Sequence, residues 1–365
     1  MKFLRVCLVA ATSCIPFVSA WAQNASEDEV DPRALRRFWV AKQTRTRVLT
    51  APAYTLNEGE REKYPGTFGV DLSHYSFDIS SSGSCGTPSG YSDPKCSCSA
   101  DWDKFVSNGL RFIYSKASDG SSADLSFPRF WTEMAAKHAS KVLFRGAYHF
   151  LRPGIDAKTQ ADAFLAAIGA TETKKADQLP PGLDIEWSNK RIIPDTPAFK
   201  ACPADRRTQS DDGHFYCDMW YTKSAGEIVK LANEWIDHVS KATGRPVIIY
   251  TNPTAWWNAV MGTAGDSLSR TQAIWTSRYT GRGPAYNPKW TKEGGSPEWK
   301  MAPLPHGASY PTAKYTTAHF WQFSENGLLS AKAFTCAGKL ESRSMDMNWL
   351  PVSAADFRTL FGVAQ

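Results

Sequence analysis

The stretch PGLDIEW, residues 181–187, carries two carboxylates on an apolar segment. Leu183 and Ile185 suit a buried β-strand, and Asp184 and Glu186 are spaced two apart. A strand would place both acids on one face, about 6.6 Å apart along the chain. Two acids on an apolar strand are costly unless a function uses them. The stretch therefore predicts a buried strand that ends in a functional site.

The composition is that of a folded protein with a large core. The chain has 365 residues, 42% of them hydrophobic and 13% aromatic, which excludes a disordered chain. Its net charge of +6 suits a polyanionic partner such as a cell wall. The same charge is also common in an ordinary basic exported protein. No arginine-rich block with interleaved aromatic residues is present, so we expect no nucleic-acid partner.

The N-terminus resembles an export signal. Lys2 and Arg5 flank a short apolar run. The run ends in the small-x-small pattern Ala20-Trp21-Ala22. The run is too short to span a membrane, so we expect residues 1–22 to be cleaved and the protein to be secreted or periplasmic.

The charged residues 23–66 predict an N-terminal tail or linker, docked loosely if at all, with one short helix over Pro32–Lys42. We expect residues 67–365 to form a single domain. Within it, short apolar strands alternate with helical stretches, which favours a mainly parallel sheet.

Eight strand candidates follow one another in this domain. They predict a TIM-like β/α barrel with some helices missing in the later half, and a doubly wound open sheet is the alternative. The candidates are FGVDLS (68–73), RFIYSKAS (111–118), VLFRGAYHF (142–150), GLDIEW (182–187), PVIIYTN (246–252), AIWTSRY (273–279), HFWQFS (319–324) and SMDMNW (344–349).

Polar side chains end several of these strands. In a barrel the carboxyl ends of the strands meet at one mouth, where the chemistry lies. A lone acid at a strand end is usually structural, but four acids and a lysine at one mouth predict a catalytic site. The residues are Asp71, Lys116, Asp184, Glu186 and Asp346.

Six aromatic residues are candidates for contact with substrate. Four of them lie on predicted strands, where an aromatic residue more often belongs to a packed core than to a sugar platform: Tyr148, Tyr250, Trp275 and Trp321. Trp187 and Tyr279 are the better candidates for stacking on a sugar ring.

The cysteine count favours disulfides. Of eight cysteines, Cys7 and Cys14 lie in the leader, and the remaining six form an even number in an exported chain. We expect Cys202 to pair with Cys217, and Cys336 to pair within the group Cys85, Cys96 and Cys98. The spacing does not suit a zinc site, and we expect no metal or other cofactor.

Nine segments in order carry a resemblance to a known family. They include GVDLSHY, FIYSKASDG, RGAYHFLRP, TQADAFL, LDIEW, VIIYTNPTAWW, IWTSRY, FWQFSENG and MDMN. The region from Phe68 to Leu350 resembles the Chalaropsis-type lysozymes, family 25 of the glycoside hydrolases. The resemblance implies a secreted N-acetylmuramidase, which acts on peptidoglycan glycan strands. We expect it to be a monomer.

The resemblance also implies roles for the acids. Glu186 would be the general acid that protonates the leaving oxygen, and Asp71 and Asp346 would stabilise the oxocarbenium-like transition state. Asp184 would position the substrate's 2-acetamido group, which acts as the nucleophile. Direct attack by Asp184 and single inversion by water are the competing mechanisms.

Two insertions depart from the family pattern. A Cys-rich segment follows Asp71 as far as Phe105, and a second runs from Ser188 to Trp220, directly after the catalytic strand. Both are expected on the mouth side, where they would shape the cleft. The alternatives are a glycosidase for another N-acetylhexosamine polymer such as chitin, and a non-catalytic cell-wall-binding barrel.

Overall fold

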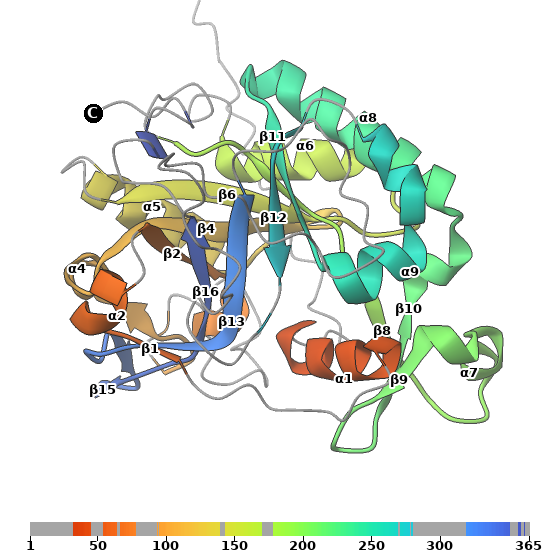
Figure 1. Cartoon of the computed structure of the whole chain (residues 1–365), viewed down its shortest axis with the longest axis horizontal. Coiled ribbons are helices and arrows are strands. Elements are labelled where there is room, and N and C mark those ends of the chain that lie inside the picture. Colours follow the sequence, from red (N-terminus) through yellow and green to blue (C-terminus); the bar gives the residue numbers. More distant parts are fainter. Residues whose placement is uncertain are drawn as a thin grey trace, which may run out of the picture.

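Eight strands close into a barrel in the computed structural model (Figure 1). The structure describes residues 32–44, 54–63, 66–77, 93, 95–138, 143–169, 178–268, 271–277, 279, 319–350, 357–358 and 361. The barrel strands are β2 (Thr67–Leu72), β4 (Leu110–Asp119), β6 (Phe144–Phe150), β7 (Gly182–Asp184), β11 (Val247–Thr251), β12 (Thr271–Ser277), β13 (His319–Leu329) and β16 (Met345–Leu350). All eight predicted strands are confirmed, and the closed barrel excludes the open sheet.

The last strand closes the barrel in the opposite direction. β2 to β13 pair in parallel, whereas β16 pairs antiparallel with both β13 and β2. The sequence analysis placed Asp346 at the end of its strand. Asp346 lies instead at the start of β16. It still reaches the mouth, because the reversed strand brings its amino end there, opposite Asp71.

The side chains that point into the barrel form an aromatic core below a polar mouth. Alternate residues of each strand face inward, since the side-chain period of a strand is two. The inner cluster includes Phe112, Tyr114, Tyr148, Tyr250, Trp275 and Phe320. The next inward positions along the strands are polar, which places the site on top of a rigid, packed floor.

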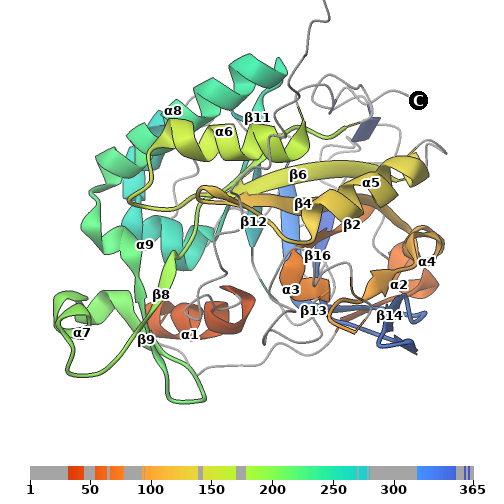
Figure 2. The ribbon, with the colours of Figure 1, turned by 180° about the vertical axis from the view of Figure 1, so that it is seen from behind.

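Three longer helices cover the outside of the first five strands (Figures 1 and 2). They are α5 (Phe127–His138), α6 (Ala157–Ile168) and α8 (Ala225–Thr243). A shorter helix, α4 (Trp102–Ser107), begins at the N-cap Asp101. Between β11 and β12 the described residues form only short pieces, η6 (Pro253–Trp257), α9 (Asn258–Val260) and η7 (Gly262–Ser267), so this later connection lacks a long helix as predicted.

The segment before the barrel is docked, and the expectation of a loose tail is wrong for its described part. It contains α1 (Pro32–Thr44), β1 (Tyr54–Leu56) and α2 (Glu58–Lys63). β1 extends the sheet by pairing in parallel with β13. Leu35, Trp39 and Leu56 are buried, because their apolar side chains find partners on the barrel.

The second insertion is a small unit of its own. β8 (Asn189–Ile192), β10 (Phe215–Asp218) and β9 (Arg207–Gln209) form an antiparallel sheet, joined by α7 (Pro197–Ala201), η4 (Ala204–Arg206) and η5 (Met219–Thr222). The predicted Cys202–Cys217 disulfide ties it, with the two Cα atoms 6.1 Å apart. Figures 1 and 2 show α1 lying beside β8 and β9.

The first insertion is described only at its two ends. It starts with α3 (His74–Phe77) and ends at β3 (Ser99–Ala100), which pairs with β14 (Phe334–Cys336) and, through it, β15 (Lys339–Glu341). Cys98 and Cys336 form a disulfide, as predicted, and Cys96 is also disulfide-bonded. Cys85 lies outside the described residues. A short strand, β5 (Ser122–Ala123), pairs with the end of β4.

None of the described helices is long and apolar enough to cross a membrane. The expected leader, residues 1–22, lies outside the described residues. The division of the chain at residue 66 stays a prediction.

Candidate active site

The four acids lie together at the mouth of the barrel. Asp71 is on β2, Asp184 ends β7, Glu186 follows it, and Asp346 is on β16. All four are buried and line one pocket, whose empty space is about 320 Å³, part of it open to solvent. The structure thus brings together every acid that the sequence placed at the strand ends.

Asp184 has the environment of a group that awaits a ligand. Its Oδ1 atom is buried and has no hydrogen-bond partner among the described residues. Buried polar atoms are almost always paired, so an unpaired one needs an explanation. Burial raises the pKa of Asp184 well above its usual value, and the neighbouring charges of Glu186 and Asp71 raise it further.

Asp71 and Asp346 are held by two amides that the sequence reading did not single out. Gln322 Nε2 donates to Asp71 Oδ2 at 2.8 Å and to Asp346 Oδ2 at 3.2 Å. Asn348 Nδ2 donates to Asp71 Oδ2 at 2.7 Å. Gln322 lies two residues beyond Phe320 and Asn348 two beyond Asp346, so the period of the strands could have identified both.

Lys116 and Tyr148 also line the pocket. The Lys116 ammonium lies 3.4 Å from Asp119 and 5.3 Å from the centre of the Tyr75 ring. Burial raises the pKa of Tyr148 well above its usual value, and the charges of Asp71 and Asp184 add to this effect. Tyr148 therefore stays a neutral hydroxyl beside the acids.

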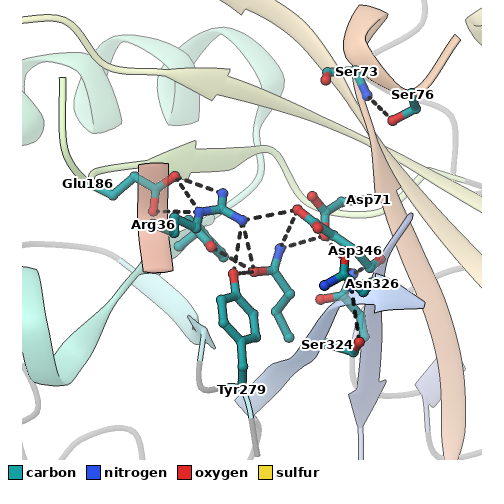
Figure 3. A network of polar contacts seen from close by, with 12 residues as sticks. Arg36, Asp71, Ser73, Ser76, Glu186, Tyr279, Ser324, Asn326 and Asp346 are labelled. Carbon is teal, nitrogen blue, oxygen red and sulfur yellow. Dashed lines mark hydrogen bonds and ion pairs between the residues drawn. The ribbon is translucent and has the colours of Figure 1, made fainter. Parts of the chain in front are cut away.

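An arginine from the N-terminal helix occupies the mouth. The guanidinium of Arg36 on α1 lies between Glu186 and Asp346 (Figure 3). Its Nη2 donates to Glu186 Oε1 at 2.7 Å and its Nη1 to Asp346 Oδ2 at 3.1 Å. Burial is the largest influence and disfavours the Arg36 cation, but Glu186, Tyr250, Tyr279 and Asp346 together outweigh it and raise the pKa of Arg36. No local sequence pattern predicts this contact, because Glu186 is 150 residues away.

Two tyrosines complete the contacts of Arg36. The Tyr279 hydroxyl accepts from Arg36 Nη1 at 2.9 Å and donates to Gln322 Oε1 at 2.6 Å. The Tyr250 hydroxyl donates to the same Gln322 oxygen at 2.8 Å, and Arg36 lies 5.5 Å from the centre of its ring. Tyr250 and Tyr279 therefore join the polar network of the mouth through Gln322, and their contact with substrate stays a prediction.

Trp187 lies next to Glu186 and is stacked on a second tryptophan. Its ring centre is 6.0 Å from that of Trp39 on α1, with the two planes 13° apart. Trp187 is buried, so its flat face is already covered in this arrangement. The geometry is that of an aromatic platform with α1 on it.

The model of the glycosyl hydrolases family 25 matches residues 95–331. The chain belongs to this family. Residues 95–331 include Asp184 and Glu186, whereas Asp71, Asp346 and α1 lie outside them. The family includes enzymes that cleave glycosidic bonds, and a pocket lined by four carboxyl groups suits that chemistry.

The chain is similar to two curated relatives and to a solved structure. It is 25% identical to Lysozyme M1 of Streptomyces globisporus, over 72% of this chain and 63% of the relative, so the match spans less than two thirds of that protein. It is 26% identical to the N,O-diacetylmuramidase of Chalaropsis sp, over 47% of this chain and 69% of the relative. The crystal structure of the lysozyme from Streptomyces coelicolor aligns with a TM-score of 0.49 and 23% identity, over 81% of this chain and 97% of that one.

Two predicted substrate contacts of this family member lie in the packed interior instead. Trp275 is in the inner core, where its Nε1 donates to Asn348 Oδ1 at 2.7 Å. Trp321 faces the outside of β13 and packs against Phe323 and Trp349. Neither ring is a pocket wall, because its strand position points it into the floor or away from the mouth.

Proposed function

We propose that this protein is an exported lysozyme, which hydrolyses the β-1,4 bond between N-acetylmuramic acid and N-acetylglucosamine in peptidoglycan. The observation that carries the proposal is the family match over the strand with Asp184 and Glu186, at a mouth that two further acids line. The matched relatives are named as a lysozyme and a muramidase.

Glu186 is the general acid of this proposal. It follows the end of β7 and its backbone carbonyl accepts from Trp220 Nε1 at 2.8 Å, which fixes the carboxyl group at the pocket wall. A general acid protonates the glycosidic oxygen as the bond to the sugar breaks. Positive charge then develops on the sugar ring, and the carboxylates of Asp71 and Asp346 stabilise it.

Asp184 positions the nucleophile. Its buried Oδ1 lacks a partner among the described residues and can accept the N–H of the substrate's 2-acetamido group. This contact would turn the acetamido oxygen toward the anomeric carbon, and the substrate would supply its own nucleophile. In the competing mechanisms Asp184 attacks the sugar itself, or water attacks once with inversion.

Substrate recognition rests on the residues around these acids. Lys116 and Tyr148 offer donors at the pocket wall, and Trp187 and Tyr279 offer ring faces for the sugars. Tyr250 supports the site through Gln322. Neighbouring sugar rings along a glycan strand need such aromatic platforms, because their apolar faces stack on them.

Export agrees with the disulfides. Cys98–Cys336 and Cys202–Cys217 suit an oxidising compartment, and the leader pattern at residues 1–22 supplies the route. We propose that the mature protein acts outside the cytoplasm as a monomer.

The products test the proposal. Purified peptidoglycan is incubated with the protein, and the soluble fragments are reduced and analysed by mass spectrometry. We expect reduced muramic acid at the new ends. Fragments that end only in glucosamine, or activity on chitin but not on peptidoglycan, would contradict the substrate assignment and favour the alternative glycosidase.

A further inference from the structure

We propose that the barrel mouth and the insertion 188–220 form a binding site for the chain's own helix α1 (Pro32–Thr44), which keeps peptidoglycan out of the mouth until it is displaced. The inference rests on the proposed function for what α1 excludes. The seating of α1 itself can be tested without any activity.

Arg36 occupies the place of the reacting bond. Its Nε donates to both carboxyl oxygens of Glu186, at 3.1 and 3.2 Å, and its Nη2 donates to Oε1. A glycosidic oxygen needs one of these two oxygens. The same guanidinium also binds Asp346, so it spans the mouth from β7 to β16 (Figure 3).

Trp39 covers the platform beside Glu186. It is fully buried and stacked on Trp187, one turn of α1 away from Arg36. A sugar ring cannot stack on the covered face of Trp187 while Trp39 lies there. Arg36 and Trp39 therefore block both the reacting position and its neighbour.

The insertion holds the outer side of α1. Trp39 Nε1 donates to Asn189 Oδ1 at 2.8 Å, and Lys42 Nζ donates to the carbonyl oxygens of Ala204 and Arg207. Arg37 forms an ion pair with Asp211 at 2.8 Å. These partners are all in the insertion, so the N-terminal helix and the insertion after β7 bind each other.

The charges in the occupied mouth oppose catalysis. Glu186 is engaged as the ion-pair partner of Arg36, whereas acid catalysis needs its proton. Burial and then the charge of Glu186 raise the pKa of Asp184, which therefore favours its protonated form. While α1 is bound, Arg36 therefore occupies the Glu186 carboxyl oxygens that a substrate oxygen would need.

The barrel does not need α1 for its closure. The eight strands close through their own pairings, and the strand that precedes them, β1, pairs with β13 without α1. Residues 45–53 separate α1 from β1. Helix α1 can therefore leave the mouth without the loss of a ladder hydrogen bond.

The first test compares two neighbouring arginines in the otherwise unchanged protein. Arg36→Ala removes the charge from the mouth, and Arg37→Ala removes the same charge from the exposed pair with Asp211. If α1 leaves the mouth in about 0.1–10% of wild-type molecules, only that fraction is active. Release of α1 in Arg36→Ala should then raise the initial rate of peptidoglycan release about 10- to 1000-fold. Arg37→Ala removes only an exposed outer contact of α1, so it should raise the rate far less, by less than about threefold. A lower or unchanged rate in Arg36→Ala would overturn the inference.

Hydrogen exchange provides a test that is independent of activity. Amides 36–42 should exchange faster in Arg36→Ala, while those of β7 and β11 keep their wild-type protection. If β7 and β11 also lose protection, Arg36 is a structural partner of the barrel and the inference fails. If α1 opens but no variant releases sugar ends, the helix-binding site stands, and both the proposed function and the block of peptidoglycan are overturned.

Discussion

Helices α8 and α1 both lie against the barrel, but different forces hold them. α8 begins with a capping box between Ser224 and Glu227, ends at Gly244 in the left-handed conformation, and buries an apolar face. The buried side chains are Ile228, Val229, Ala232, Trp235, Ile236 and Val239. Apolar burial stabilises such a helix under all conditions in which the barrel is folded.

At the centre of α1 a buried cation contacts carboxylates. Arg36 lies among Leu35, Phe38 and Trp39, which are also buried. Taking an ion pair out of water costs about as much as its attraction returns, but removal of one partner leaves the other charge buried and unpaired, which costs about 3–5 kcal/mol. The contact adds specificity, because only a mouth rich in acids accepts Arg36. The comparison teaches that α8 belongs to the fold and α1 to the control of the site.

The largest expected effect on stability concerns α8. Trp235 is fully buried and stacks on His149 at 5.2 Å, so Trp235→Ala should lower the free energy of unfolding by about 3–5 kcal/mol. The rate per folded molecule should stay within about twofold. Urea unfolding and peptidoglycan release on the same samples measure both quantities.

Lys230→Ala is the matched control for α8, since Lys230 lies on its exposed face and pairs with Glu234 only at 3.9 Å. It should change stability by less than about 0.5 kcal/mol. A Trp235→Ala protein that is fully stable but inactive would break the comparison, because α8 would then serve the site.

The next effect concerns the mouth. Asp184→Asn should lower the rate about 10²- to 10³-fold, because it replaces the carboxyl group that would position the substrate's 2-acetamido group. The raised pKa of Asp184 means that the native state binds its proton more tightly than the unfolded chain. Stability is therefore lost as the pH rises from about 4 through that raised pKa.

The Asp184→Asn protein lacks this titration, so its stability should depend less on pH and exceed that of the wild type at pH 7. Urea unfolding between pH 4 and 8 measures the difference. Equal pH dependence in the two proteins would mean that Asp184 costs the fold nothing. That would contradict its burial with an Oδ1 atom that has no hydrogen-bond partner among the described residues.

The smallest effect concerns the insertion 188–220, which contacts α1. The Cys202–Cys217 disulfide closes a loop with a sequence separation of 15, worth about 3 kcal/mol in the chain-entropy model. Replacing both residues by Ser should loosen the insertion and release part of α1, so the rate should rise by less than in Arg36→Ala. Replacing Cys98 and Cys336 is the control, since it should lower stability without raising the rate.

The barrel and its acids were predictable because their signals are local. Each strand is a short apolar run that ends in a polar residue, and the period of two places Asp71, Asp184 and Asp346 on the inner face. Gln322 and Asn348 obey the same period. The roles of Trp275 and Trp321 could not be assigned from the sequence, because an aromatic residue on a strand looks the same whether it faces a pocket or a core.

The docking of α1 was not predictable from the sequence. Arg36 stands beside Arg33 and Arg37 in a charged segment, and such a run is usually solvated. Its partners Glu186 and Asp346 are 150 and 310 residues away. The direction of β16 was not predictable either, because it depends on pairing with β2 and β13, which are distant in the sequence or leave no local pattern.

Glu186→Gln shows whether the acids at the mouth perform chemistry. Gln keeps the shape of the side chain but cannot donate the proton. We expect a 10²- to 10⁴-fold loss of peptidoglycan release, with a melting temperature close to that of the wild type. The same loss should appear when Arg36→Ala is present, because α1 no longer limits access. A Glu186→Gln protein that releases muramic acid ends at near the wild-type rate would contradict a catalytic role for Glu186.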